Sequence, residues 1–206
     1  MDNYIQPVFS KQRLEAFSDG VIAIIITLLV LEIKVPHING EINFNTLIVS
    51  LFHLIPKFLS WALSFFMVLI MWVNHHRIFD DLKSSSNGLM WFNGLLLFFI
   101  SFVPFPTAFM GDYFNQPLSS FFFGISLSLM GLSFGFLRLY IYSNPKLLKE
   151  EIDLSKYKSM LIKTFLFGPL FYLSGAIVSF VNVHISYCIY ALVPVYFIFF
   201  GIKKSN

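Results

Sequence analysis

Six long apolar segments recur along the chain, separated by short polar stretches. They cover residues 16–35, 46–74, 89–109, 118–142, 160–181 and 185–202. A helix needs about 20 apolar residues to cross the hydrocarbon core of a membrane. The segments are continuous and lack the alternation of period two that is typical of barrel strands. The pattern therefore predicts an all-α integral membrane protein with six transmembrane helices.

Two of the six segments are interrupted. His53, Pro56 and Lys57 break the second, so we expect its first turns at the membrane interface rather than in the hydrocarbon. The third carries two prolines within residues 104–107, and each proline removes a backbone donor. Two interpretations remain open for these prolines: a kink that acts as a hinge, or a simple helix end. The polar stretch 143–159 predicts a solvated loop with some helical content.

The composition fits a membrane protein. Of the 206 residues 57% are hydrophobic and 12% charged, whereas soluble domains are about 25% charged. This argues against a soluble enzyme, a nucleic-acid-binding domain or a disordered chain. The expected surroundings are a lipid bilayer, with no nucleic-acid partner. The first apolar run lacks a small-residue cleavage site, so we expect it to stay as the first span. The spans fill residues 1–206 as one transmembrane domain, and the single Cys188 allows no intrachain disulfide.

The basic residues predict the orientation. Only Lys34 and Lys57 fall on one side of the six spans. The other twelve of the fourteen fall on the opposite side: Lys11, Arg13, Arg77, Lys83, Arg138, Lys146, Lys149, Lys156, Lys158, Lys163, Lys203 and Lys204. Cytoplasmic loops carry the excess of Lys and Arg. We therefore expect a multi-pass protein of the cell membrane with both termini in the cytoplasm.

Polar residues cluster where the first span begins. On a helix Ser18 and Asp19 point more than 90° away from a stripe formed by Arg13, Phe17, Ile24, Leu28, Leu31 and Val35. An acid at the edge of hydrocarbon is costly and usually faces a partner or water. A cluster held by neighbouring helices without a functional role and a functional site both remain open at this point.

A second polar cluster, Trp72-Val73-Asn74-His75-His76, ends the second span. Adjacent histidines on a helix point about 100° apart, which is poor geometry for chelating a metal. We expect no metal site here, and a hydrogen-bonded anchor is the favoured interpretation. Asp19 is predicted at the same end of the bundle, so it could meet the histidine pair.

These motifs resemble the bacterial members of the transmembrane protein 175 family, relatives of a lysosomal potassium channel. The resemblance rests first on Arg13-x-x-x-Phe17-Ser18-Asp19. The Trp72-to-His76 segment and Pro104-Phe105-Pro106-Thr107 support it. It covers the whole six-span layout, and it is what points to potassium conduction.

The resemblance implies a homotetramer whose four first helices line one pore, with K⁺ as permeant ion and no cofactor. The narrowest ring falls on Ile24, Thr27 gives a polar layer one turn on, and Leu28 and Leu31 extend the apolar lining. Residues 21–31 are apolar all round, so periodicity alone selects no such stripe. The remaining motif residues would anchor helices rather than bind ions: Arg13, Phe17, Ser18, Asp19, Trp72, Asn74, His75 and His76.

No Thr-Val-Gly-Tyr-Gly filter occurs in the chain. A ring of four isoleucines would close by dewetting and would favour the less tightly hydrated K⁺ only modestly. The alternative is a proton-coupled secondary transporter using Asp19 and His75 or His76, although no inverted repeat is evident. A membrane enzyme is not expected, because no nucleophile motif is present.

Glu32 and Lys34 follow the first span at its outer end. A ring of acidic side chains at a pore mouth can concentrate cations, although simple solvated flanks are the favoured interpretation. Six spans in so short a chain leave too little protein for a pore of its own. The small size therefore argues for assembly of several copies.

Overall fold

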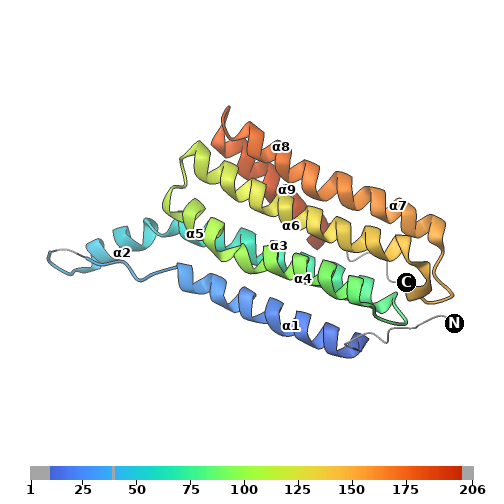
Figure 1. Ribbon diagram of the computed structural model, residues 1–206. Coiled ribbons are helices and arrows are strands. Elements are labelled where there is room, and N and C mark those ends of the chain that lie inside the picture. The colour runs from blue at the N-terminus through green and yellow to red at the C-terminus, as the bar shows by residue number, and fades with distance from the viewer. Residues whose placement is uncertain (1–9, 39, 201–206) are drawn as a thin grey trace.

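The computed structural model describes residues 10–38 and 40–200, and these fold into a long, almost entirely helical bundle (Figure 1). One shorter apolar helix covers Val183–Tyr196. Five helical segments are long and apolar enough to cross a membrane: Lys11–Glu32, Ile55–Asp80, Asn87–Asp112, Pro117–Ser143 and Leu154–Val178. The all-α membrane fold is confirmed, and six spans agree with it. The predicted end of the last span (residues 201–202) and the basic pair Lys203 and Lys204 lie outside the described residues.

The first helix, α1 (Lys11–Leu28), begins five residues earlier than the apolar pattern predicts. Ser10 caps it by accepting a hydrogen bond from the backbone N–H of Arg13, which satisfies one donor of the first turn. Beyond Leu28 the chain tightens into a 3-10 segment, η1 (Leu29–Glu32). The first span is therefore straight over most of its length and changes its winding at one end.

The predicted second segment forms two helices, α2 (Phe44–Phe52) and α3 (Ile55–Asp80). Pro56 lies in the first turn of α3, where its missing N–H costs nothing. α2 begins with a reciprocal capping box between Asn43 and Thr46. It projects from one end of the bundle and buries none of its residues (Figure 1). The interruption seen in the sequence is thus a real break between two helices.

The third segment also divides, into α4 (Asn87–Phe102) and α5 (Pro104–Asp112). The helix resumes directly after Val103, so the prolines form a joint within the span rather than its end. The Thr107 hydroxyl donates to the carbonyl of Val103 at 2.7 Å and accepts from Ser64 of α3 at 2.7 Å. The joint is therefore tied to the neighbouring helix.

The longest helix, α6, forms the core and packs against α4, α5, α7, α8 and α9. Small residues on α6 allow close approach. A Cβ on Gly131, for example, would lie 3.2 Å from the ring of Pro169. The elements of this half of the chain are α6 (Pro117–Ser143), η2 (Pro145–Leu147), α7 (Leu154–Phe165), the π-helical turn η3 (Leu166–Leu170), α8 (Phe171–Val178) and α9 (Val183–Phe200).

The stretch 143–159 differs from the prediction of a solvated loop. α7 begins at Leu154, six residues before the predicted span, because Asp153 caps it with its carboxylate. Leu147, Leu148 and Tyr157 are buried. Apolar side chains therefore tie most of this stretch to the bundle.

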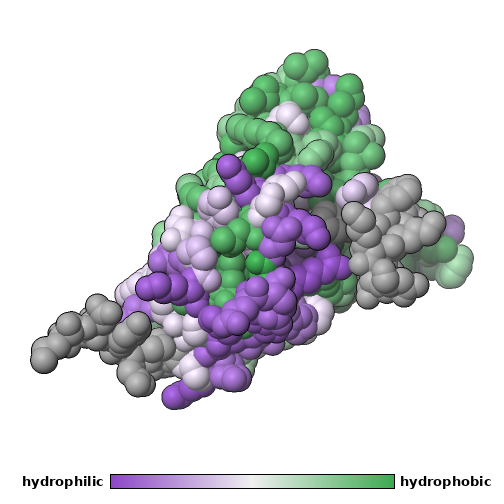
Figure 2. Space-filling model, turned by 90° about the vertical axis from the view of Figure 1, so that its right-hand side faces the viewer, coloured by the Kyte–Doolittle hydropathy of each residue, from purple (hydrophilic) through white to green (hydrophobic). Residues whose placement is uncertain are grey.

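The loops after α3 and α6 meet at one end of the bundle, which we call the basic end. Lys83 N–H donates to the carbonyl of Leu147, and Lys149 N–H donates to that of Asp81. The ammonium of Lys11, at the start of α1, donates to the carbonyl of Leu82 at 3.0 Å. Figure 2 looks onto this end, where hydrophilic residues gather. Lys11, Lys83 and Lys149 thus meet at one end of the bundle, in agreement with the predicted partition.

Candidate pore helix and its anchoring network

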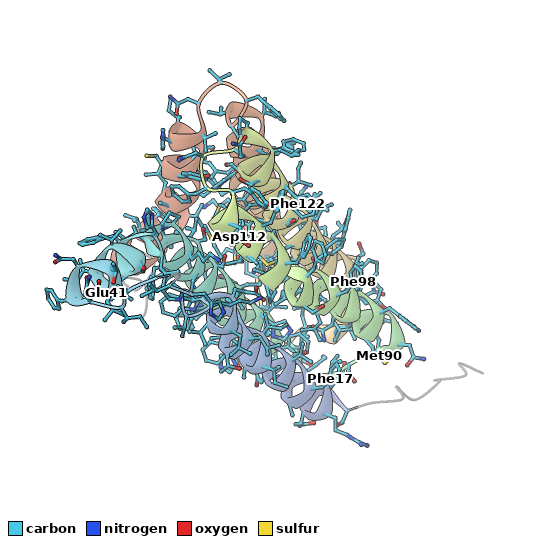
Figure 3. The ribbon with its side chains drawn as sticks, turned by 90° about the vertical axis from the view of Figure 1, so that its left-hand side faces the viewer. Phe17, Glu41, Met90, Phe98, Asp112 and Phe122 are labelled. Atoms are coloured by element: carbon cyan, nitrogen blue, oxygen red, sulfur yellow. The ribbon has the colours of Figure 1, made fainter. Side chains whose placement is uncertain are left out.

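α1 lies along one edge of the bundle, with Phe17 in its first half (Figure 3). One face packs against α3 and α4. That face buries Leu14, Ser18, Ile22 and Ile25, followed by Leu29 of η1. The other face is apolar and uncovered, with exposed fractions of 62% for Phe17, 60% for Ile24, 43% for Leu28 and 66% for Leu31. Within the described chain, most of the predicted stripe therefore has no protein neighbour.

The structure tests two parts of the predicted stripe: the residues that point away from it and its far end. Ser18 is fully buried and Asp19 half-buried, so both turn away from the stripe as predicted. Val35, by contrast, lies beyond the last helical residue, Glu32, and is not on the helix. Its assignment to the helical stripe is wrong, because the chain leaves the helical path after the 3-10 turn.

Thr27 is also exposed on α1. Its hydroxyl donates to the backbone carbonyl of Ile24 at 2.7 Å. The hydroxyl proton is thereby committed to the helix, and the oxygen keeps a lone pair free to accept a hydrogen bond or to contact a cation. Thr27 can act as an electron-pair donor on an otherwise apolar surface.

A buried chain of hydrogen bonds ties α1 to α4 and α3. The Ser18 hydroxyl donates to the carbonyl of Leu14, and the side-chain N–H of Asn93 donates to the Ser18 oxygen, both at 2.8 Å. The amide oxygen of Asn93 lies 2.8 Å from Nε2 of His75. Because that oxygen can only accept, Nε2 of His75 carries the proton. The donor and the acceptor at each step of this chain are therefore fixed.

A second contact joins α1 to α3 directly. Nε1 of Trp72 donates to a carboxylate oxygen of Asp19 at 2.9 Å. The indole stacks on the ring of His76, whose Nε2 lies 3.5 Å from the carboxylate of Asp80 one turn further on. α1 and α3 are thus joined by two routes, one from Ser18 through Asn93 to His75 and one from Asp19 to Trp72. Within the described residues no hydrogen bond joins Asp19 to either histidine.

Asn93 was not among the site residues predicted from the sequence. A lone amide within the apolar run Trp91-Phe92-Asn93-Gly94-Leu95 was the available signal, because polar side chains inside a span are costly and usually paired. Three predicted anchor residues lie outside this network. Asn74 is half-buried on α3, and Arg13 is exposed at the start of α1. Phe17, predicted as an anchor, lies instead on the uncovered face of α1 and is 62% exposed.

Across the described parts of the chain, no three His, Cys, Asp or Glu side chains are grouped as a metal site would require. The clustered polar groups are instead joined to one another and to the backbone. Their arrangement can fix the rotation of α1 about its own axis. It thereby determines which face of α1 stays uncovered.

A family model described as the endosomal/lysosomal potassium channel TMEM175 matches residues 13–104. A potassium channel of Chamaesiphon minutus is 39% identical to this chain over 189 residues, which cover 90% of this chain and 92% of that protein. The chain belongs to the TMEM175 family. The resemblance seen in the sequence motifs is confirmed.

Other members of the TMEM175 family show how far the similarity extends. A potassium channel of a Chryseobacterium species is 37% identical and covers 89% of this chain and 90% of its own length. The human endosomal/lysosomal proton channel TMEM175 is 25% identical over 86% of this chain and 36% of its own. The crystal structure of a lysosomal potassium-selective channel TMEM175 homologue from Chamaesiphon minutus has a TM-score of 0.79 at 34% identity, covering 91% of this chain and 96% of that one. These relatives are named as channels rather than enzymes.

Proposed function

We propose that the chain is one subunit of a homotetrameric channel that lets K⁺ flow passively down its gradient. The observation that carries the proposal is the uncovered apolar face of α1, on a helix whose rotation is fixed by Ser18 and Asp19. Family members with this layout are named potassium channels. Four such faces turned toward a common axis would form a pore.

In this arrangement Ile24 forms the constriction. It is 60% exposed in the second half of α1, where the single subunit offers it no neighbour. Four isoleucine side chains supply no oxygen ligands, so water leaves a narrow ring of them readily. An ion must distort its hydration shell to cross. This favours K⁺ over Na⁺, because K⁺ holds its water less tightly.

Thr27 would form a polar layer beside the constriction, and Leu28 and Leu31 would continue the apolar lining toward the other end. The free lone pair on the Thr27 oxygen can replace part of the water that an ion loses. Selectivity built in this way is modest, because four hydroxyls replace only a fraction of the hydration shell.

The polar network acts as framework in this proposal. Ser18, Asn93 and His75 are buried and satisfied by one another, and Asp19 accepts from Trp72. Groups that are already paired and turned away from the uncovered face are poorly placed to bind a passing ion. Their role is to hold α1 at one rotation against α3 and α4.

The proposed location is the cell membrane, with the basic end toward the cytoplasm. That end carries Lys11 and the paired loops after α3 and α6. Lys57, at the opposite end, pairs with Asp112 at 2.5 Å. Since cytoplasmic loops are enriched in Lys and Arg, both termini would lie in the cytoplasm.

Ion flux from proteoliposomes tests the proposal. We expect purified protein to release K⁺ down its gradient without a proton gradient. Ile24→Asn should raise Na⁺ flux relative to K⁺ flux, because an amide ring holds water where isoleucines exclude it. Ile177→Asn on α8 is the matched control, since Ile177 is the same residue type with the same 60% exposure. It should leave the ratio unchanged.

Two results would contradict the channel, and a third would contradict the role of Ile24. Absence of K⁺ flux in well-folded, correctly assembled protein would rule out the channel function. Saturable uptake that depends on a proton gradient would favour the transporter alternative with Asp19 and a histidine. Equal effects of Ile24→Asn and Ile177→Asn would remove Ile24 from the constriction.

A further inference from the structure

At the end opposite the basic end, the 3-10 segment η1 closes over a small cavity. Its volume of about 10 Å³ is enough for the centre of one water molecule. Glu32, the last residue of η1, lines it together with Trp61 and Lys57 of α3. Thr107, Ala108 and Gly111 of α5 complete the wall. The cavity therefore lies between the end of the proposed pore helix and its two neighbours.

The indole N–H of Trp61 is buried and has no hydrogen-bond partner among the described residues. Buried donors are nearly always paired with protein or with ordered water. Trp61 is also one of the residues that line the cavity. This orphaned donor is the observation that points to an occupant.

The wall offers two further polar partners. Glu32 is half-buried and brings a carboxylate, which only accepts hydrogen bonds. Lys57 has three N–H donors and pairs with Asp112 at 2.5 Å, which leaves donors for another partner. Buried waters typically make about three hydrogen bonds. One indole, one carboxylate and one ammonium would supply three.

The arrangement repeats one seen at the basic end. There Trp72 of α3 donates directly to Asp19 of α1. Trp61 precedes Trp72 by eleven residues, which is close to three helical turns, so both indoles lie on nearly the same face of α3. α1 and α3 run antiparallel (Figure 1). Along α1 and its continuation η1, an acid therefore lies near a tryptophan of α3 at two places, Asp19 near Trp72 and Glu32 near Trp61.

We propose that one bound water bridges Nε1 of Trp61 to the carboxylate of Glu32, with Lys57 as its third partner, and that Glu32 thereby positions the outer end of the pore helix. The water site stands on the cavity and the buried indole alone. Its effect on conduction rests on the proposed channel function. Glu32 is a positioning residue here, not an ion ligand.

The water site is tested by proton-detected solid-state NMR of protein in lipid bilayers with ¹⁵N-labelled tryptophan. The three indole signals are assigned from the Trp61→Phe, Trp72→Phe and Trp91→Phe variants. We expect a cross-peak to a long-lived water at the Trp61 indole, and its loss in Glu32→Leu. The Trp72 indole, which donates to Asp19, is the internal control and should not move. A Trp61 indole without a water cross-peak, or one unchanged by Glu32→Leu, would overturn the proposal.

Flux measurements test the positioning role. We expect Trp61→Phe and Glu32→Leu each to lower K⁺ flux and the double variant to lower it no further, because both remove the same bridge. Glu32→Gln keeps an acceptor and should therefore restore K⁺ flux. If Glu32 acted instead by concentrating cations with its charge, Gln would not restore the flux. Glu41→Gln, an exposed acid at the same end (Figure 3), controls for surface charge. Additive losses, or no recovery with Gln, would contradict positioning. An inactive wild type with an intact water cross-peak would contradict only the channel.

Discussion

The two ends of α1 are attached to the bundle by different chemistry. In the half of α1 nearer the basic end, direct side-chain hydrogen bonds join Asp19 to Trp72 of α3 and Ser18 to Asn93 of α4, and the ammonium of Lys11 donates to the carbonyl of Leu82. At the opposite end α1 gives way to a 3-10 turn that ends at Glu32 beside a water-sized cavity. One end is held by direct donor and acceptor pairs, whereas among the described residues no direct side-chain hydrogen bond joins η1 to a neighbouring helix.

The difference indicates where α1 can move at least cost. Breaking the buried chain at Ser18 leaves polar groups unpaired, which is expensive away from water. The opposite end contains three breaks in helical winding: after Leu28, before Ile55 and at Val103. Helix ends and joints absorb small displacements more readily than helix interiors do. We therefore expect the basic end to act as the fixed support.

Breaking the support should have the largest effect on stability. Asn93→Leu leaves the N–H of His75 without an acceptor and removes the donor to Ser18. We expect a loss of about 2 kcal/mol in the free energy of unfolding, because buried polar groups in membranes are costly to leave unpaired. Asn45→Leu on α2, where Asn45 is exposed, makes the same exchange as a control. Denaturant unfolding in detergent measures the stability of both variants. If Asn93→Leu were as stable as Asn45→Leu, the hydrogen-bond network would not stabilise the fold.

Much of the support could be predicted from the sequence. Periodicity placed Ser18 and Asp19 on the face opposite the apolar stripe, and the structure finds both turned inward. The basic residues also predicted which loops share an end. Asn93 was not predicted, because a helix sequence shows that an amide is buried but not which helix it meets. The route from His75 to Ser18 runs through a third helix, and that needs the fold.

The opposite end was harder to predict. The prolines of residues 104–107 allowed either a kink or a helix end, and the decision depends on Thr107 and Ser64, which are 43 positions apart. The boundary near Val35 was misplaced because hydrophobicity continues where helical winding stops. Breaks in helical winding depend on local hydrogen bonds, and these are harder to predict from the sequence than the burial of a side chain is. The pore role of Ile24, Thr27, Leu28 and Leu31 needs neighbouring subunits and stays a prediction.

Two glycines test whether the outer end of the bundle, around Gly111, yields to an added methyl group more easily than the packed core around Gly131. A Cβ on Gly111 would lie 3.2 Å from Cα of Lys57, and one on Gly131 would lie 3.2 Å from the ring of Pro169. If the outer end yields, Gly111→Ala should change stability by less than about 0.5 kcal/mol, since relief of strain and the helix preference of alanine offset the contact. Gly131→Ala should cost about 1 kcal/mol in the packed core. Similar losses in thermal unfolding would argue against a yielding end.

The smallest expected effect concerns the dependence of stability on pH at the basic end. Asp81 follows α3 outside the membrane-spanning segments, and burial raises the pKa of its carboxyl above the ordinary value of 3.8. Arg138, Lys149 and Lys11 oppose this shift by attraction, whereas Asp80 adds to it by repulsion. A raised pKa means that the folded state binds the proton more tightly than the unfolded state does. The stabilising contribution is therefore complete below the ordinary pKa and is lost as the pH rises through the folded one.

Asp81→Asn should remove this contribution, because asparagine does not titrate. We expect the unfolding midpoint of the wild type to fall more steeply as the pH rises through the acid range than that of the variant. The difference should be slight, because water screens a carboxylate that is only half-buried. Glu151→Gln, an exposed acid in the neighbouring loop, should keep the wild-type slope. If Asp81→Asn also kept the wild-type slope, the charges around Asp81 would not affect stability. The stability of the basic end would then depend on its hydrogen bonds alone.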